Sequence, residues 1–269
     1  MRSAYEQIQT YKEEIPSLFT FNEFIIIADG TEAKIGTLTS PWEWFLPWKT
    51  IDGTKREPSS KPQLEVALKG MCNKQVVIDL IHHFIGFTKT KKKTIKIIAG
   101  YHQYHAANKA IQSTKKAIGA SRKIGVVWHT QGSGKSLTMA FYVGKITRDP
   151  ELKNPSIVVL TDRNDLDDQL FTVFSDHSQI FREKPKKIER QSDLKTQLKV
   201  SCGGIFFTTI QKFLDKTESQ FELLSTRDNI IVVADEAHRT QYGLQAILKN
   251  DRLRYGFAKY LRDALPNAS

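Results

Sequence analysis

Four stretches of the chain have the consecutive apolar residues that are typical of buried β-strands. Residues 156–160 and 229–234 are the longest, and residues 205–207 and 126–127 are shorter runs of the same kind. Strands of a parallel sheet are covered on both faces, so they contain continuous apolar runs instead of alternating ones. The pattern therefore predicts an α/β fold built on a parallel sheet.

The beginning of the chain shows a different pattern. Residues 4–14 have helix-forming composition, and a proline follows them directly. Residues 18–27 are rich in Phe and Ile and predict a strand. Asp29 and Gly30 form a strong turn signal, so residues 33–39 are expected to return as the second strand of a hairpin.

Two helices are predicted next, at residues 64–71 and 76–87. Between the hairpin and these helices, residues 41–48 hold three of the four tryptophans and two prolines. Prolines argue against regular structure, and clustered indoles usually fill a seam between packed elements. We interpret this stretch as a packed connector, with base stacking by the indoles as the alternative.

Residues 88–94 contain four lysines, and we place a domain boundary here. The predicted domains are residues 1–88 and residues 89–269. A lysine run is either a solvated surface segment or a contact to a phosphate backbone. The formal net charge of +11 makes nucleic acid the expected partner of such a chain.

The cysteines and the hydropathy limit the class of protein further. The two cysteines, Cys72 and Cys202, lie far apart and without neighbouring ligand residues, so neither a disulfide framework nor a zinc site is predicted. No apolar run approaches the roughly 18 residues of a membrane span. We expect a cytoplasmic protein without a membrane partner.

A glycine-rich loop follows the short apolar run at residues 126–127. Its sequence, Thr-Gln-Gly-Ser-Gly-Lys-Ser, stands between that predicted strand and residues 137–146, which have apolar positions at helical spacing. Glycines let a backbone close around an anion, and the helix dipole adds positive potential. The residues predicted to hold a nucleotide are Thr130, Gln131, Gly132, Ser133, Gly134, Lys135 and Ser136.

Two adjacent carboxylates follow the predicted strand at residues 229–234. Asp235 would reach a Mg²⁺ ion beside Ser136, and Glu236 could activate the attacking water. A polar helix start is the alternative interpretation of Asp-Glu-Ala-His taken alone. Together with the glycine-rich loop, the pair indicates nucleoside triphosphate hydrolysis in the pattern of superfamily 2 helicases and translocases.

Further polar residues extend this prediction. The Gln103 amide can match the donor and acceptor of an adenine edge, and a neighbouring tyrosine could stack on the ring. Arg163, Thr208 and Thr209 follow or end predicted strands, where they could contact a phosphate backbone.

These motifs together resemble the restriction subunit of type I restriction-modification enzymes. The resemblance rests on Tyr101-His102-Gln103-Tyr104, on residues 128–136, on residues 161–169 and on residues 235–239. That family joins a nuclease domain to two RecA-like motor domains, which use ATP to pull double-stranded DNA past specificity and methylation subunits before cleavage. The resemblance implies an incomplete first RecA-like domain, preceded by the C-terminal part of a nuclease-like α/β domain.

The resemblance also implies a role for each matching residue. Tyr101 and Gln103 would contact adenine, Lys135 and Glu236 would be catalytic, Ser136 and Asp235 would hold Mg²⁺, Arg163, Thr208 and Thr209 would face DNA, and Gln7 and Tyr11 would belong to a nuclease motif.

This sequence departs from the family pattern at three points. His129 stands where the full P-loop has its first glycine. The nuclease carboxylates and the second motor domain have no counterpart, so we expect a central piece of a longer polypeptide that is inactive alone. Two alternatives stay open, namely another superfamily 2 helicase or remodeller, and an inert nucleotide-binding or DNA-binding module.

Overall fold

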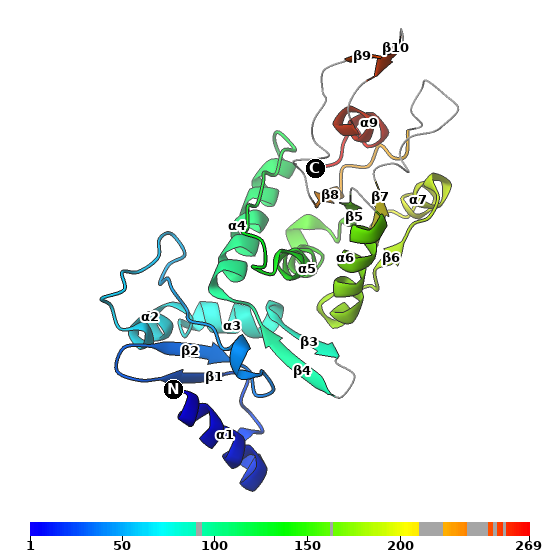
Figure 1. The fold of residues 1–269 in the computed structure, drawn as a ribbon. Coiled ribbons are helices and arrows are strands. Elements are labelled where there is room, and N and C mark those ends of the chain that lie inside the picture. Colours follow the sequence, from blue (N-terminus) through cyan, green and yellow to red (C-terminus); the bar gives the residue numbers. More distant parts are fainter. Residues whose placement is uncertain (90–92, 162–163, 210–222, 236–246, 250–251, 255–256) are drawn as a thin grey trace. The chain divides into compact units, whose positions relative to one another are not determined.

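The structure is a computed structural model. It describes all residues except 90–92, 162–163, 210–222, 236–246, 250–251 and 255–256 (Figure 1). The described residues form two compact units. Unit 1 comprises Met1–Asn108 and Thr130–Phe141, and unit 2 comprises Lys109–His129 and Tyr142–Ser269. The division into domains at residues 88 and 89 stays a prediction.

Unit 1 begins with the predicted helix and hairpin. Its first elements are α1 (Arg2–Glu14), the 3-10 helix η1 (Pro16–Phe19), β1 (Ile25–Ala28), β2 (Ala33–Gly36) and the 3-10 helix η2 (Trp42–Trp44). In the turn, the Asp29 carboxylate accepts the N–H groups of Glu32 at 2.8 Å and Thr31 at 3.0 Å. These two bonds favour the charged form and lower the pKa of the Asp29 carboxyl.

Both predicted strands of the hairpin were too long. The strand predicted at residues 18–27 begins only at Ile25, because Pro16 starts a 3-10 turn in which Leu18 is exposed. The return strand ends at Gly36, since the Ser40 N–H donates to the Thr37 carbonyl at 3.2 Å and closes a turn. In both cases a local hydrogen-bonded turn replaces the extended backbone.

The helix predicted at residues 76–87 is wrong in its second half. The next elements are α2 (Gln63–Gly70), α3 (Lys74–His83), β3 (Ile85–Lys89) and β4 (Thr94–Ile98). β3 pairs with β4 in an antiparallel hairpin from Ile85 opposite Ile98 to Lys89 opposite Thr94. Gly86 disfavours a helix at this point. The β-branched and aromatic residues of this segment favour a strand, and β4 provides the partner with which it pairs.

The tryptophan-rich segment packs inside unit 1. The rings of Trp42 and Phe45 stack at 6.0 Å, and Tyr5 of α1 contacts them at 5.6 and 5.4 Å. Trp48 is only 3% exposed. The predicted packed connector is therefore confirmed for these side chains, whereas Trp44 is 43% exposed, so base stacking by that indole stays open.

Unit 2 contains the predicted parallel sheet. Its strands are β5 (Ser156–Thr161), β6 (Lys186–Lys187), β7 (Ile205–Thr209) and β8 (Ile230–Ala234), in the order β6-β7-β5-β8 with every pair parallel. All six residues of β5 are buried. The α/β fold class and three of the four predicted strands are thus confirmed.

Side chains on β7 show how both faces of this sheet are covered. Phe207 contacts Phe171 and Phe174 of α6 (Asn164–Asp176) at 5.3 and 4.9 Å. Phe206 points to the opposite face, where it joins Leu194 of α7 (Gln191–Gln197) and residues at the end of α9 (Phe257–Ala264). Two covered faces explain the continuous apolar runs of the sequence.

The remaining elements are short or belong to both units. They are α4 (Tyr101–Ile118), α5 (Lys135–Ile146), the 3-10 helices η3 (Pro150–Leu152) and η4 (Ser178–Ile180), and the paired strands β9 (Ile247–Lys249) and β10 (Arg252–Arg254). Among the described helices, none is both long and apolar enough to span a membrane.

The strand predicted at residues 126–127 is wrong. Val126 and Trp128 are each 87% exposed, and the segment pairs with no strand in the described part of the chain. Gly125 has a φ of +132°, which interrupts an extended backbone just before the apolar run. The edge of β8 that faces away from β5 pairs instead with Ser269, whose N–H donates to the Ile230 carbonyl at 2.9 Å.

Phe207 provides a test of the sheet packing. We expect Phe207→Ala to lower the free energy of unfolding by about 3–5 kcal/mol, because the aromatic contacts with α6 leave a cavity when they are lost. Phe87→Ala is the matched control, since that ring is 43% exposed. Denaturant titration measures both variants, and a similar loss for the two would contradict the assigned packing.

Candidate functional site

The glycine-rich loop forms a tight turn immediately before α5. The Ser133 N–H and hydroxyl donate to the Thr130 carbonyl at 3.2 and 2.7 Å. Gly132 and Gly134 both have a φ of +79°, a left-handed conformation that side chains disfavour. The loop conformation therefore requires glycine at these two positions, as the sequence pattern predicts.

The loop ends as the N-terminal cap of α5. The Thr138 N–H donates to the Gly134 carbonyl at 3.0 Å, which is the first bond of this 12-residue helix. Lys135 and Ser136 thus lie in the first turn, whose N–H groups have no earlier turn to bond. Such a helix start attracts anions, and the Lys135 ammonium adds a full positive charge.

Gln103 contacts this loop directly. Its side chain is 7% exposed, its Oε1 accepts the Gly100 N–H at 2.9 Å, and its Nε2 donates to the Gly134 carbonyl at 3.2 Å. A Cβ added to Gly134 would lie 2.5 Å from that Nε2 atom. The amide predicted to contact adenine is therefore hydrogen-bonded at both ends to the backbone.

His102 is a loop contact that the sequence reasoning missed. Its Nε2 lies 2.9 Å from the Ser133 carbonyl, so consecutive residues of α4 bind consecutive residues of the loop. The available signal was its position directly before Gln103. The ring of Tyr101 approaches the edge of Trp48 at 6.4 Å and that of His102 at 5.4 Å.

Polar residues of α3 and α4 also pack together within unit 1. Tyr104 is 7% exposed and meets Phe84 at 4.9 Å. Burial, together with Asp79, raises the pKa of the Tyr104 hydroxyl, so it stays protonated at neutral pH. Asp79 also accepts the Asn108 amide at 3.2 Å, which ties α3 to α4 within unit 1.

Asp235 follows the carboxyl end of β8 in unit 2. It is half-buried, and its N–H donates to the Leu160 carbonyl of β5 at 2.9 Å. Carboxyl ends of parallel strands are the usual positions of functional residues in α/β sheets. Glu236 lies outside the described residues. In the part of the chain that the structure describes, three or more His, Cys, Asp or Glu side chains nowhere gather as a metal-binding group.

Two of the three residues predicted to face DNA are buried. Thr208 and Thr209 lie in β7 and are 1% and 2% exposed. The register places them opposite Leu160 and Thr161 of the fully buried β5, which accounts for their burial. Arg163 lies outside the described residues, so the DNA contacts of all three stay a prediction.

The two residues of the predicted nuclease motif contact each other on α1. The Gln7 Nε2 donates to the Tyr11 hydroxyl oxygen at 2.6 Å, and both side chains are exposed. Their spacing of four residues places them on one helix face, so this contact follows from helical geometry. Their role stays a prediction.

Comparison with protein families identifies the second part of the chain. The model of the SWI2/SNF2 ATPase family matches residues 102–269, a range that includes the loop, α5 and the whole parallel sheet. The chain belongs to the SWI2/SNF2 ATPase family. A nucleotide is therefore the ligand class that this ATPase domain uses. A second model, of the type I restriction enzyme R protein N terminus, matches residues 1–44, where α1 and the first hairpin lie.

Curated relatives of this SWI2/SNF2 ATPase confirm the predicted resemblance. The type I restriction enzyme HindI endonuclease subunit of Haemophilus influenzae is 47% identical over 99% of this chain. A Methanocaldococcus jannaschii protein named as a candidate type I restriction enzyme MjaIXP endonuclease subunit is 35% identical over 100% of it. The type I restriction enzyme SsaAORF53P endonuclease subunit of Staphylococcus saprophyticus is 30% identical over 90% of it. The chain spans 26%, 26% and 25% of these relatives, about a quarter of their length.

Three glycines separate the effect of backbone strain from that of close contact. We expect Gly134→Ala to abolish nucleotide binding, because it meets both a positive φ and Gln103. Gly132→Ala has open space and should cost only the left-handed strain of about 1–2 kcal/mol. Gly119→Ala, with open space and no positive φ, is the control. Calorimetric titration with ATP ranks the binding affinities of the three variants, and tight binding by Gly134→Ala would refute the assigned loop geometry.

Proposed function

We propose that the loop between Thr130 and Gly134 binds the phosphates of ATP. The observation that supports this most is the pair of left-handed glycines at the start of α5, in a chain that belongs to an ATPase family. Loop N–H groups would bind the phosphate oxygens, and Lys135 would neutralise the β and γ phosphates. Gln103 and Tyr101 would contact adenine, and the amide would then exchange a backbone partner for the base.

We further propose Mg²⁺ as the metal of this site. Mg²⁺ is usually held by one or two protein oxygens together with substrate phosphates and waters, so the Ser136 hydroxyl and the Asp235 carboxylate fit it chemically. When bound, Mg²⁺ would neutralise charge that develops on the phosphates. Glu236 would orient and deprotonate the attacking water, and Lys135 would stabilise the transferred phosphoryl group.

We propose that ATP hydrolysis here drives translocation on double-stranded DNA, within a type I restriction endonuclease subunit. The match of residues 1–44 to the R protein N terminus supports this proposal over a helicase or remodeller of another kind. DNA cleavage, and assembly with methylation and specificity subunits, would belong to the longer protein of which the relatives are examples. Of the residues predicted to contact DNA, Arg163 would do so, whereas Thr208 and Thr209 are buried in β7.

Lys135 provides the direct test of nucleotide binding. We expect Lys135→Ala to weaken ATP binding at least tenfold, because a charged contact to the phosphates is lost. Lys145→Ala is the matched control, since Lys145 lies in the last turn of the same helix. Isothermal calorimetry in Mg²⁺ measures both, and equal affinity of Lys135→Ala and the unchanged chain would exclude the loop as the phosphate site.

The salt dependence of DNA binding tests the proposal that this chain contacts double-stranded DNA. We expect binding without sequence preference, because lysine and arginine contacts to phosphates do not read bases. The logarithm of the binding constant should fall linearly with the logarithm of salt concentration, by about 0.9 for each neutralised phosphate. Fluorescence anisotropy with two unrelated duplexes measures it, and a sequence-selective or salt-independent affinity would contradict the proposal.

A further inference from the structure

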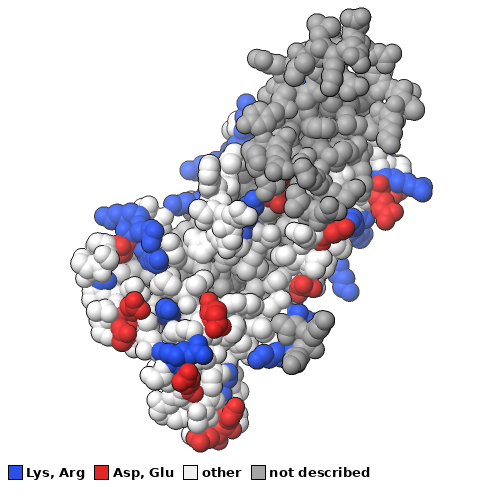
Figure 2. Space-filling view, viewed as in Figure 1, with Lys and Arg blue, Asp and Glu red and all other residues white. Residues whose placement is uncertain are grey.

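On the face seen in Figure 2, the described part of this chain of net charge +11 shows no uninterrupted positive area. Figure 2 shows that Lys and Arg side chains alternate with Asp and Glu side chains over the visible described surface. A polyanion therefore needs local arrangements in which cations lie together without carboxylates.

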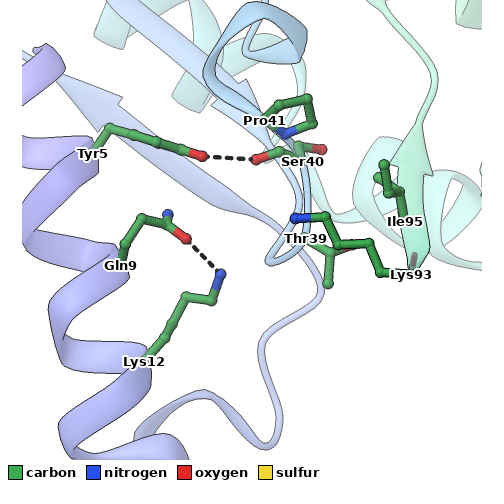
Figure 3. A pocket seen from close by; sticks show the side chains of 8 residues that line it. All are labelled: Tyr5, Gln9, Lys12, Thr39, Ser40, Pro41, Lys93 and Ile95. Atoms are coloured by element: carbon green, nitrogen blue, oxygen red, sulfur yellow. Dashed lines mark hydrogen bonds between the residues drawn. The ribbon is translucent and has the colours of Figure 1, made fainter. Parts of the chain in front are cut away.

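One cleft of unit 1 meets this requirement. It has a volume of about 310 Å³ and lies between α1, the segment after β2 and the start of β4 (Figure 3). Its lining residues are Tyr5, Gln9, Lys12, Thr39, Ser40, Pro41, Lys93 and Ile95. They include two lysines and no carboxylate. We call it the α1 cleft.

The helical repeat of α1 builds one wall of the α1 cleft. Tyr5, Gln9 and Lys12 are separated by four and three residues and share one face of the helix. This face differs from that of Gln7 and Tyr11, which contact each other and do not line the cleft.

Hydrogen bonds fix the opposite wall. The Tyr5 hydroxyl donates to the Ser40 carbonyl at 3.3 Å, and Thr39 Oγ1 accepts the Lys96 N–H of β4 at 2.6 Å. The Ser40 and Thr37 hydroxyl oxygens are buried and form a hydrogen bond of 2.8 Å. The segment after β2 is thus held both to α1 and to β4, and the cleft exists without a ligand to shape it.

Lys12 is partly buried in this cleft. Its ammonium donates to the Gln9 Oε1 at 2.8 Å and to the Leu38 carbonyl at 2.5 Å, and an ammonium has three N–H donors. Burial and then the charge of Lys93 lower the pKa of Lys12, and the charge of Glu13 opposes this shift only in part. The fold therefore brings two cations together at a cost, which a bound anion would offset.

The other groups of the cleft are also donors. The Gln9 oxygen already accepts a hydrogen bond from Lys12, so the Gln9 NH₂ group is the part of this amide that can bind an anion. The Thr39 hydroxyl accepts from the Lys96 N–H and can donate its own proton. In Figure 3 the Lys93 amine points across the cleft toward α1. Several donors around two ammonium groups match a tetrahedral oxyanion with acceptors on all sides.

We propose that the α1 cleft binds a phosphate of the DNA backbone, with Lys12 and Lys93 as its principal ligands. This inference rests on the proposed function, since it assigns part of the DNA contact to unit 1. The lysine run at residues 89–93 supplies further cations in the same stretch of sequence. A backbone phosphate explains donors without any base-reading acceptor.

Two charge-removing variants test the cleft. We expect Lys12→Gln and Lys93→Gln each to lower the salt slope of duplex binding by about 0.9, and the double variant by about 1.8. Lys74→Gln is the matched control. Lys74 is exposed at the start of α3, and its substitution removes the same single positive charge away from the cleft. Lys12 is partly buried, so Lys12→Gln could also lower the melting temperature. Lys93 is exposed, so Lys93→Gln tests the cleft without a loss of stability.

The outcomes separate this site from the proposed function. An unchanged slope in the double variant, or an equal loss in Lys74→Gln, overturns the cleft while general DNA binding stands. Absence of salt-dependent duplex binding in the unchanged chain overturns both. Lys135→Ala should keep the full slope contribution of Lys12 and Lys93.

A titration with inorganic phosphate distinguishes the source of the anion. Side-chain NMR of the lysines should show the pKa of Lys12 rising toward its ordinary value as phosphate binds, because the anion favours the ammonium. Duplex DNA should displace the phosphate and keep the raised pKa. Saturable phosphate binding that duplex DNA does not displace would show a free-anion site and refute the assignment to the DNA backbone.

Discussion

The burial of β5 on both edges and both faces is the constraint on which unit 2 depends. Six consecutive buried residues must satisfy their N–H and C=O groups within the sheet, which requires a strand on each edge, and β7 and β8 fill these places as parallel partners. Parallel strands require crossovers, which place helices on both faces. The same constraint fixes Asp235, because β8 reaches its last paired residue just before the carboxylate.

A second constraint acts at the glycine-rich loop. The Gly134 carbonyl accepts from the Thr138 N–H, the Thr138 hydroxyl and the Gln103 amide, so the start of α4 and the start of α5 share one oxygen. A nucleotide base that binds Gln103 must compete with this bond. Under the proposed adenine contact, base recognition and the position of the phosphate loop would be linked through this single amide.

The sequence predicted features that depend on local chemistry and missed those that depend on a partner. The apolar run of β5 and the glycines of the loop were predicted correctly, because burial on two faces and positive φ each require particular residue types. The runs at residues 126–127 and 85–87 were interpreted wrongly. An apolar segment becomes a strand only beside an available edge, and β4 supplies one for β3 whereas Gly125 interrupts the other segment.

The site was predictable to the same extent. The positions of Lys135 and Ser136 at the start of a helix were predictable from residue types, but the hydrogen bonds of Gln103 to backbone groups and the burial of Thr208 depend on tertiary neighbours. The α1 cleft illustrates this limit most clearly. Lys12 and Lys93 are 81 positions apart in the printed chain, and only Lys93 belongs to a stretch that the sequence singles out, the lysine run at residues 88–94. Only the pairing of α1 with the end of β2 and the start of β4 brings their charges together. Two lysines that line one fixed cleft are a physical signal that composition cannot show, and they indicate an anion more specifically than the net charge does.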